Sequence, residues 1–358
     1  MKILFLTPYP RDTAPSQRFR FELYYDALEE AGLHYETSSF WDEKGWNQLY
    51  TKGSGVGKVI ALIKGFARRK LLMLQMGSYD VVFIHREVAP IGPPVFEWYI
   101  AKVLKKKIIY DFDDAIWLPN TSEQNSIVGR LKWHSKVASI CRWSWKVSAG
   151  NAYLADYARQ YCQQVEITPT IVDTTAHTSI LSSQLSSLNA QLVVGWTGSH
   201  STLKYLQPLV PILQELQQQT DFTFLVIADQ DPQLPLRNYQ YIKWSKETEV
   251  EDLNRMDIGL MPLEDDQWSK GKCGFKAIQY GAIGVPALVS PVGVNAEIVE
   301  DGISGYHCLT DSDWEIAITS LIKDHELRTK MGQAGRERIV KHYSVESQKT
   351  SFLALFDH

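Results

Sequence analysis

Short apolar runs alternate with segments of helical spacing along most of this chain. In the first half the apolar runs are continuous, and between them apolar residues recur every three or four positions. Continuous apolar strands are buried on both faces, which is typical of a parallel sheet covered by helices. The predicted strands are Ile3–Leu6, Val81–Ile84, Ile108–Tyr110, Lys146–Ala149 and Val165–Thr168, and the predicted helices are Arg18–Ala31, Gly57–Met76 and Ala152–Tyr161.

A polar break divides this pattern into two halves. Asp173–Ala190 is rich in Ser, Thr and Gln, which indicates a linker. After it we predict strands at Gln191–Trp196, Phe222–Ile227, Ile258–Met261, Ala287–Ser290 and Tyr306–Leu309, and a helix at Thr202–Gln218. We therefore predict an α/β fold of two doubly wound, Rossmann-like domains, residues 1–175 and 190–343, facing across a cleft. Residues 344–358 are expected to form a helix that packs back on the first domain.

Composition excludes several other classes of protein. With 358 residues each domain can bury a core of its own. The net charge of −4 is not that of a general nucleic-acid binder. The four cysteines are far apart and form no Cys-x-x-Cys pair, which argues against a zinc site or a disulfide framework and suits a reducing compartment.

The chain shows no targeting signal that we can identify. The apolar run after Met1 is too short for a signal peptide, and no stretch approaches the ~20 apolar residues that span a bilayer. We expect a cytoplasmic protein. Two basic segments, Lys58–Leu74 and Arg130–Lys146, leave two interpretations open: peripheral contact with the anionic inner face of the cell membrane, or solvated outer helices.

The loop before residue 275 collects positive charge. Lys270, Lys272 and Lys276 fall within seven residues that contain no acid, and Gly271 and Gly274 allow the backbone to approach a ligand. A helix predicted from about residue 275 points free N–H groups at the same place. This pattern favours a diphosphate site, and a solvated basic loop is the alternative. A second glycine turn, Pro291–Val294, adds further donors before a helix that begins at residue 295.

The segment from Lys272 to Gly293 resembles the donor-site signature of family 4 glycosyltransferases, the retaining enzymes of the GT-B fold. It reads Lys-x-x-x-Lys-x-x-Gln-Tyr-x-Ala-x-Gly-Val-Pro-x-Leu-Val-Ser-Pro-Val-Gly. Other parts of the family pattern occur in the expected order at Pro169–Asp173, Gly195–Ser199, Asp257–Leu263 and Asp301–Gly305. The resemblance implies a sugar transferase that binds a nucleotide-diphosphate sugar.

The resemblance also implies roles for individual residues of the second domain. At the positions of two glutamates of the family, this chain has Gly271 and Gln279. A Gln can still hydrogen-bond a ribose. Lys272 and Lys276 resemble the diphosphate-binding lysines of a lysine-rich subset. The remaining donor-binding residues implied by the pattern are Gly198, Ser199, Lys204, Gly293 and Val294.

Candidate residues of the first domain follow predicted strands. His85 ends the run Val81–Ile84, where the family has a histidine that faces the donor sugar, so a catalytic role and a structural role both stand. Arg18 and Arg20 lie in a loop after the first strand, where they would contact an acceptor phosphate or the donor. The alternative there is a helix capped by Ser16.

Asp111, Asp113 and Asp114 have the spacing of an Asp-x-Asp metal site. Doubly wound two-domain transferases neutralise the diphosphate with side chains and helix ends, so we expect no metal and no cofactor beyond the nucleotide-sugar co-substrate. We interpret Asp113 and Asp114 as acceptor-side or loop residues. The predicted function is transfer to a hydroxyl of a glycan or lipid-linked glycan with retention of configuration. A nucleotide-sugar epimerase and a non-catalytic binding protein are the alternatives.

Overall fold

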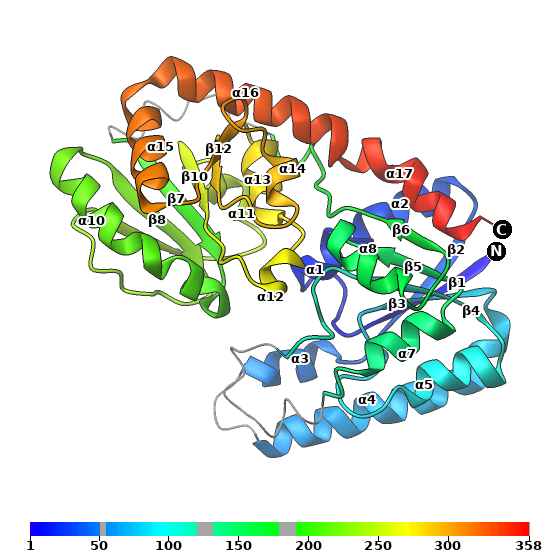
Figure 1. The fold of residues 1–358 in the computed structure, drawn as a ribbon. Helices are drawn as coiled ribbons and strands as arrows, with labels where there is room; N and C mark the ends of the chain where they lie inside the picture. Colours follow the sequence, from blue (N-terminus) through cyan, green and yellow to red (C-terminus); the bar gives the residue numbers. More distant parts are fainter. Residues whose placement is uncertain (51–54, 120–131, 179–190, 358) are drawn as a thin grey trace. The chain divides into compact units, whose positions relative to one another are not determined.

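The computed structural model describes residues 1–50, 55–119, 132–178 and 191–357. These residues form two compact units, each of which is described separately (Figure 1). Unit 1 comprises Met1–Thr170 and Gln348–His358, and unit 2 comprises Ile171–Ser347. Unit 2 begins earlier than the sequence predicts, because the Val172 N–H donates to the Tyr343 carbonyl at 2.9 Å and Val172 accepts from the Val345 N–H at 3.2 Å.

Unit 1 is built on a parallel sheet with the order β2-β1-β3-β4-β5-β6 in the described residues. Its strands are β1 (Lys2–Thr7), β2 (His34–Ser39), β3 (Val81–His85), β4 (Lys107–Phe112), β5 (Lys146–Ala149) and β6 (Val165–Ile167). Its helical segments are α1 (Pro15–Arg18), η1 (Glu22–Tyr24), α2 (Tyr25–Glu30), α3 (Glu43–Tyr50), α4 (Gly55–Gln75), η2 (Met76–Ser78), α5 (Val95–Trp98), η3 (Tyr99–Val103), α7 (Lys136–Trp143) and α8 (Ala152–Arg159).

The last residues of the chain pack on the core of unit 1. The helix α17 (Val345–Leu353) is followed by the short segment η6 (Ala354–Phe356). Phe352 stacks on Tyr24 with ring centroids 4.1 Å apart, and Phe356 lies against Phe5 and Phe83. Burial of these rings fixes the C-terminal segment to this sheet.

Unit 2 repeats the design with the strand order β12-β11-β10-β7-β8-β9. Its strands are β7 (Val193–Gly198), β8 (Thr223–Ala228), β9 (Tyr239–Lys243), β10 (Ile258–Met261), β11 (Ala287–Val289) and β12 (Gly305–His307). Its helical segments are η4 (His200–Tyr205), η5 (Gln207–Leu209), α10 (Val210–Gln219), α11 (Glu249–Leu253), α12 (Gln267–Lys270), α13 (Phe275–Ala282), α14 (Asn295–Ile298), α15 (Asp311–Lys323) and α16 (His325–His342).

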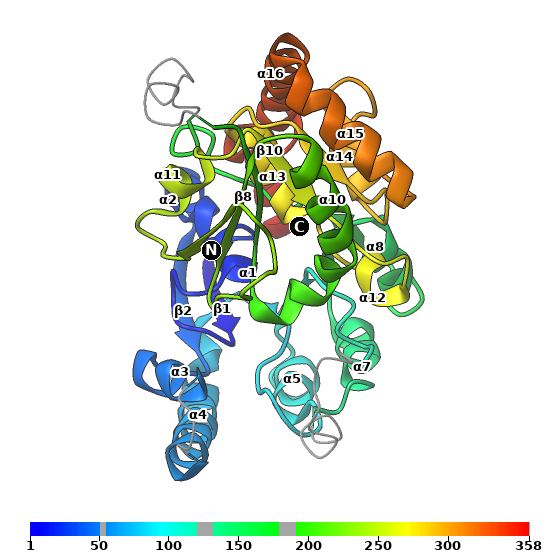
Figure 2. The ribbon, with the colours of Figure 1, turned by 90° about the vertical axis from the view of Figure 1, so that its left-hand side faces the viewer.

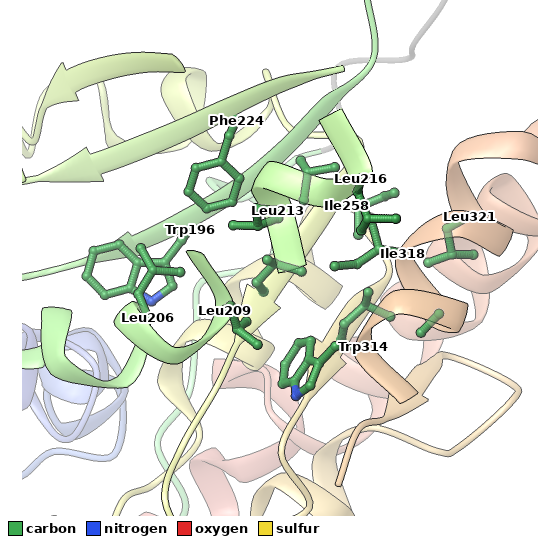
Figure 3. Packing of buried hydrophobic residues seen from close by; sticks show 14 of the residues in the cluster. Trp196, Leu206, Leu209, Leu213, Leu216, Phe224, Ile258, Trp314, Ile318 and Leu321 are labelled. Carbon is green, nitrogen blue, oxygen red and sulfur yellow. The ribbon is translucent and has the colours of Figure 1, made fainter. Parts of the chain in front are cut away.

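The core of unit 2 lies where its sheet meets α10 and α15. Figure 3 shows Trp196 and Phe224 from the sheet, Leu213 from α10, and Trp314 and Ile318 from α15 in one cluster. All of these side chains are buried, so the sheet and the two helices share one apolar interior.

Two predicted helices are interrupted in the structure. The segment predicted as Arg18–Ala31 forms α1, η1 and α2, and the segment predicted as Thr202–Gln218 forms two short turns before α10 begins. Pro208 and Pro211 explain the second case, because each lacks the N–H that a continuous helix needs and each lies in the first turn of a segment. No described helix is both long and apolar enough to cross a membrane.

Candidate functional site

A charged network closes the carboxyl end of the sheet in unit 1. His85, Asp111 and Ser148 occupy aligned positions on β3, β4 and β5. The Asp111 carboxylate accepts from Ser148 Oγ at 2.7 Å and lies 2.7 Å from His85 Nδ1. Its third partner is Arg20, whose guanidinium forms an ion pair with Asp111 and donates to the Thr168 carbonyl. All five residues are buried.

The network fixes how the imidazole of His85 is oriented. Burial alone would raise the pKa of Asp111, but the Arg20 charge and the His85 hydrogen bond outweigh it and hold the pKa well below its usual range. An ionised carboxylate only accepts, so His85 Nδ1 donates. Nε2 has no hydrogen-bond partner in the described residues, and the Asp113 carboxylate lies 4.0 Å from it. Asp111 therefore fixes the orientation of the ring and leaves Nε2, which is buried, without a hydrogen bond in the described residues.

The same network corrects the role expected for Arg20. Arg20 is almost completely buried, and its guanidinium binds Asp111, Ser148 and Thr168 within unit 1. Arg20 thus neutralises a buried carboxylate instead of reaching a ligand. Arg18 is half-buried at the end of α1, over the Phe19 ring. Ser16 does not cap α1, because Ala14 is the N-cap and Pro15 begins the helix.

The other two aspartates bind a strained arginine. Arg86 has a positive φ of 59°, and its guanidinium lies 2.7 Å from both Asp113 and Asp114. Burial works against the charge of Arg86, but the two carboxylates raise its pKa above the usual value. Both carboxylates are therefore engaged within unit 1. In the described part of the chain no group of three or more His, Cys, Asp and Glu side chains is arranged to hold a metal ion.

In unit 2 three lysines gather at two aromatic rings. Lys204 Nζ lies 4.8 Å and Lys272 Nζ 5.6 Å from the centroid of Tyr205, and Lys276 Nζ lies 5.7 Å from the centroid of Trp196. Both rings are buried. Two cations at one ring repel each other, so this arrangement favours an anion between them. Tyr205 is absent from the sequence prediction, although it directly follows Lys204.

The backbone beside these lysines is folded around two left-handed glycines. Gly274 has φ 67° and precedes α13, and no side chain caps that helix. Gly293 has φ 57°, and a Cβ there would lie 2.7 Å from the carbonyl oxygen of Lys270. The turn at Gly293 thus touches the lysine loop, and the neighbouring Val294 side chain lies close to Gly274. By contrast, Gly271 has an ordinary helical conformation at the end of α12, so its backbone does not require glycine.

The helix α13 is attached to the sheet through Tyr280. Its hydroxyl donates to the Leu260 carbonyl at 3.2 Å and accepts from the Thr197 N–H at 3.0 Å. The absence of a side chain at Gly259 leaves room for the Tyr280 ring, because a Cβ there would lie 2.5 Å from that ring. The N-terminus of α13, which carries Lys276, is thereby held at a fixed place.

Two predicted donor-binding residues have internal partners instead. Gln279 is buried, and its amide donates to Glu249 at 3.3 Å. This geometry does not support the predicted ribose contact. Ser199 caps η4 in a reciprocal arrangement with Thr202. It directly follows Gly198, and a Cβ on Gly198 would contact the Trp196 ring. Ser199 therefore orders the turn that carries Lys204.

Residues 191–338 match the family model described as glycosyl transferases group 1. No curated protein sequence matches the chain significantly.

Among solved structures, the chain is similar to a sucrose-phosphate synthase from Thermosynechococcus elongatus, with 13% identity over 99% of this chain and 98% of that one and a TM-score of 0.72. It is also similar to Anabaena HepE solved with UDP-glucose, with 14% identity over 99% of both chains and a TM-score of 0.67. A glycosyltransferase from Rickettsia africae has 13% identity over 99% of this chain and 97% of that one, with a TM-score of 0.65. The chain therefore has the α/β fold of the GT-B glycosyltransferases, with two Rossmann-like domains.

Proposed function

We propose that this protein is a glycosyltransferase that moves a sugar from a nucleotide-diphosphate sugar to a hydroxyl of a glycan or lipid-linked glycan. The observation that carries the proposal is the cluster of Lys204, Lys272 and Lys276 within the segment that matches the group 1 model. Like charges in a partly desolvated place favour a polyanion. Anabaena HepE, which has the same fold, was solved with UDP-glucose.

The diphosphate is the part of the donor that unit 2 would bind. Lys272 and Lys276 neutralise its charge, and the uncapped first turn of α13 offers backbone N–H groups to the same oxygens. The left-handed turns at Gly274 and Gly293 let the backbone approach closely. These groups act through charge and position, so we propose that transfer needs no metal ion. Turnover that persists in EDTA supports this, and loss by chelation that Mg²⁺ or Mn²⁺ restores contradicts it.

His85 is the residue that we propose contacts the sugar. Its Nδ1 is held by Asp111 while Nε2 has no partner in the described residues. As the bond between the anomeric carbon and the diphosphate breaks, positive charge develops on the sugar and negative charge on the phosphate. A new bond from the acceptor oxygen forms on the same face, and the acceptor proton passes to the leaving phosphate. Configuration is retained without a protein nucleophile.

The experiment that tests the function measures hydrolysis, transfer and binding together. Purified protein is incubated with UDP-, GDP- and ADP-sugars, with and without acceptor extracts, and products are identified by mass spectrometry. Transfer of the sugar supports the proposal. Conversion of the donor to an isomer without acceptor supports an epimerase instead.

A variant of His85 separates catalysis from binding. We expect His85→Ala to lower kcat about 10²-fold or more, as for loss of one group that stabilises the transition state, with little change in donor affinity. His325→Ala, at the exposed start of α16, is the matched control and should leave both unchanged. Equal turnover in wild type and His85→Ala contradicts the role, and thermal melting verifies that the variant is folded.

One observation favours a non-catalytic binding protein as the second candidate. The two family glutamates are replaced by Gly271 and Gln279, and Gln279 is buried against Glu249. If wild type binds a donor tightly but shows neither hydrolysis nor transfer under any of these conditions, the binding protein replaces the transferase.

A further inference from the structure

The long helix α4 of unit 1 exposes several large apolar side chains. Val56, Ile63 and Leu74 are 78%, 62% and 82% exposed. The exposed apolar residues of α4 are Val56, Val59, Ile60, Ile63, Leu71 and Leu74. Their spacing of three, four and seven or more places them on one side of a helix with 3.6 residues per turn. The outward face of α4 is thus a continuous apolar stripe.

The opposite face of α4 carries small residues and an arginine, and it packs against the rest of unit 1. Ala61, Gly65 and Arg69 are buried at intervals of four residues. A Cβ on Gly65 would lie 2.5 Å from the Phe40 ring, so the helix backbone rests directly on that ring. Arg69 donates to the carbonyls of Val88, at 2.9 Å, and Thr7, at 2.8 Å. These contacts prevent α4 from rotating its apolar face inward.

The charges of α4 have one sign. Gly55–Gln75 contains five basic residues and no acid. Two of them, Arg68 and Arg69, face the unit, where Arg68 binds Asp42 at 3.0 Å. Lys64 and Lys70 are exposed, and on a helical wheel Lys64 lies beside the apolar stripe while Lys70 lies between Val59 and Ile63 on its other side. The stripe is therefore accompanied by positive charge.

A neighbouring helical segment adds exposed aromatic residues. Phe66 of α4 and Phe96 of α5 pack with ring centroids 6.1 Å apart. Trp98 of α5 and Tyr99 of η3 are exposed, as are Val95 and Val103. Figures 1 and 2 both show α4 and α5 along the lower edge of unit 1. Trp and Tyr are enriched where proteins meet the headgroup region of a membrane.

The second basic segment of the sequence does not present such a face in the part that the structure describes, residues 132–146. Lys136 on α7 is buried and forms an ion pair with Glu87 at 2.7 Å. Lys146 donates to the carbonyls of Ala354 and Asp357. Arg130 lies outside the described residues. Lys136 and Lys146 thus have partners within unit 1, whereas Arg142 of α7 is exposed over the Tyr161 ring. Because α4 carries the larger group of exposed apolar residues, it is the surface to consider.

We propose that α4, together with α5 and η3, is a surface that docks on an anionic lipid bilayer. The apolar stripe enters the boundary between headgroups and acyl chains while Lys64 and Lys70 contact lipid phosphates. A second copy of the chain is a poor occupant, because a two-fold contact would bring lysines against lysines with no acid on α4 to neutralise them. The proposal does not depend on the chemistry proposed above.

The test is flotation of the full chain with vesicles of phosphatidylcholine alone or mixed with phosphatidylglycerol. We expect wild type to float with the anionic vesicles at low salt and to be released at high salt, because screening weakens the attraction. Ile63→Glu with Leu74→Glu should lower the bound fraction about tenfold or more. The matched control is Leu309→Glu with Ile316→Glu in unit 2, at positions that are 79% and 65% exposed, and it should bind like wild type.

A fluorescent probe gives a second, independent measurement. All four native cysteines are buried, so a dye attached to Ile63→Cys reports α4 selectively. Its emission should shift to shorter wavelength with anionic vesicles, and a dye at Ile316→Cys should not shift. Equal flotation of the α4 variant and the control overturns the proposal. The proposal is also overturned if wild type is a dimer in size-exclusion chromatography, the α4 variant is a monomer, and neither protein binds vesicles.

Discussion

The two units place charged clusters near the carboxyl ends of their sheets, but they arrange the charges in opposite ways. In unit 1, Arg20 and His85 are paired with the buried Asp111 carboxylate. In unit 2, Lys204 and Lys272 share the ring of Tyr205. The first cluster pairs opposite charges, whereas in the second two positive charges share one ring.

The difference indicates which property of the protein each cluster controls. A buried pair of opposite charges is required by the fold, since either partner alone is costly inside a protein. A group of like charges is held in place by the fold at some cost, and a bound anion relieves that cost. We therefore expect changes in unit 1 to appear in stability and changes in unit 2 to appear in ligand affinity.

The largest effect is expected for Asp111→Asn. This change leaves the Arg20 charge buried without a counter-ion and should lower the free energy of unfolding by about 3–5 kcal/mol. Urea denaturation measures it. Asp156→Asn, which removes an exposed ion pair with Arg159, is the control and should cost less than about 1 kcal/mol. Equal stability of both variants would show that the closed network is not required by the fold.

The pH dependence of stability tests the same network. The folded pKa of Asp111 lies below the unfolded value of about 3.9, so its stabilisation is fully present above the unfolded value and is lost as the pH falls from there through the folded pKa. We expect the stability of wild type to decrease on acidification below about pH 5 more steeply than that of Asp111→Asn. Parallel curves for the two proteins would contradict the assignment of an ionised Asp111.

The next largest effect is expected for Gly293→Ala in unit 2. Both the positive φ and the backbone of Lys270, 2.7 Å from a Cβ, oppose a side chain there, so the cost should be about 1–3 kcal/mol. Gly302→Ala is the matched control, because Gly302 also has a positive φ, of 72°, but no atom within 4 Å of its Cβ. A greater loss of stability and of UDP affinity in Gly293→Ala isolates the close contact with the lysine loop. Equal losses would mean that only the backbone conformation matters.

The interior strands are predicted well from sequence, whereas one of the two edge strands of each sheet is missed. The central strands β1, β3, β4, β7, β8 and β10 coincide with predicted apolar runs because both of their faces are buried. The strands β2 and β9 are missed. They lie at the edges of the two sheets and leave most of their residues partly exposed, so no continuous apolar run marks them.

The candidate site is likewise predicted only in part from the sequence. The lysine cluster is visible in the sequence because Lys272 and Lys276 are close neighbours along the chain. The partnership of Arg20 with Asp111 joins residues that are 91 positions apart and has no local pattern. The burial of Gln279 against Glu249 is likewise a contact between distant segments. Local motifs predict charge, whereas they do not predict which charges the fold neutralises.

A smaller effect, on affinity alone, is expected for Lys272→Ala and Lys276→Ala. Each removes a charged hydrogen-bond donor and should weaken UDP-sugar binding by about 1–3 kcal/mol in calorimetry, with little change in stability. Lys270→Ala is the control, because Lys270 is bound to Asp265 at 3.0 Å on the surface. Unchanged affinity in both variants would remove the diphosphate site from this loop.

The smallest effect, and the one that separates the two units most clearly, is expected for Lys204→Met. Lys204 and Lys272 approach the same Tyr205 ring, so removing one charge relieves their mutual repulsion in the free protein. Stability should therefore stay the same or rise slightly, whereas removal of a charge in unit 1 lowers it. UDP affinity should fall by about 0.5–1 kcal/mol, since Lys204 adds one half-buried cation to the site.

A double-mutant cycle tests whether Lys204 and Lys272 bind the same group. Lys204→Met should weaken binding less once Lys272 is already Ala if one phosphate group bridges both lysines. A loss of stability without loss of affinity would show that Lys204 is held by partners of opposite charge, and the contrast between the units would then fail at this residue.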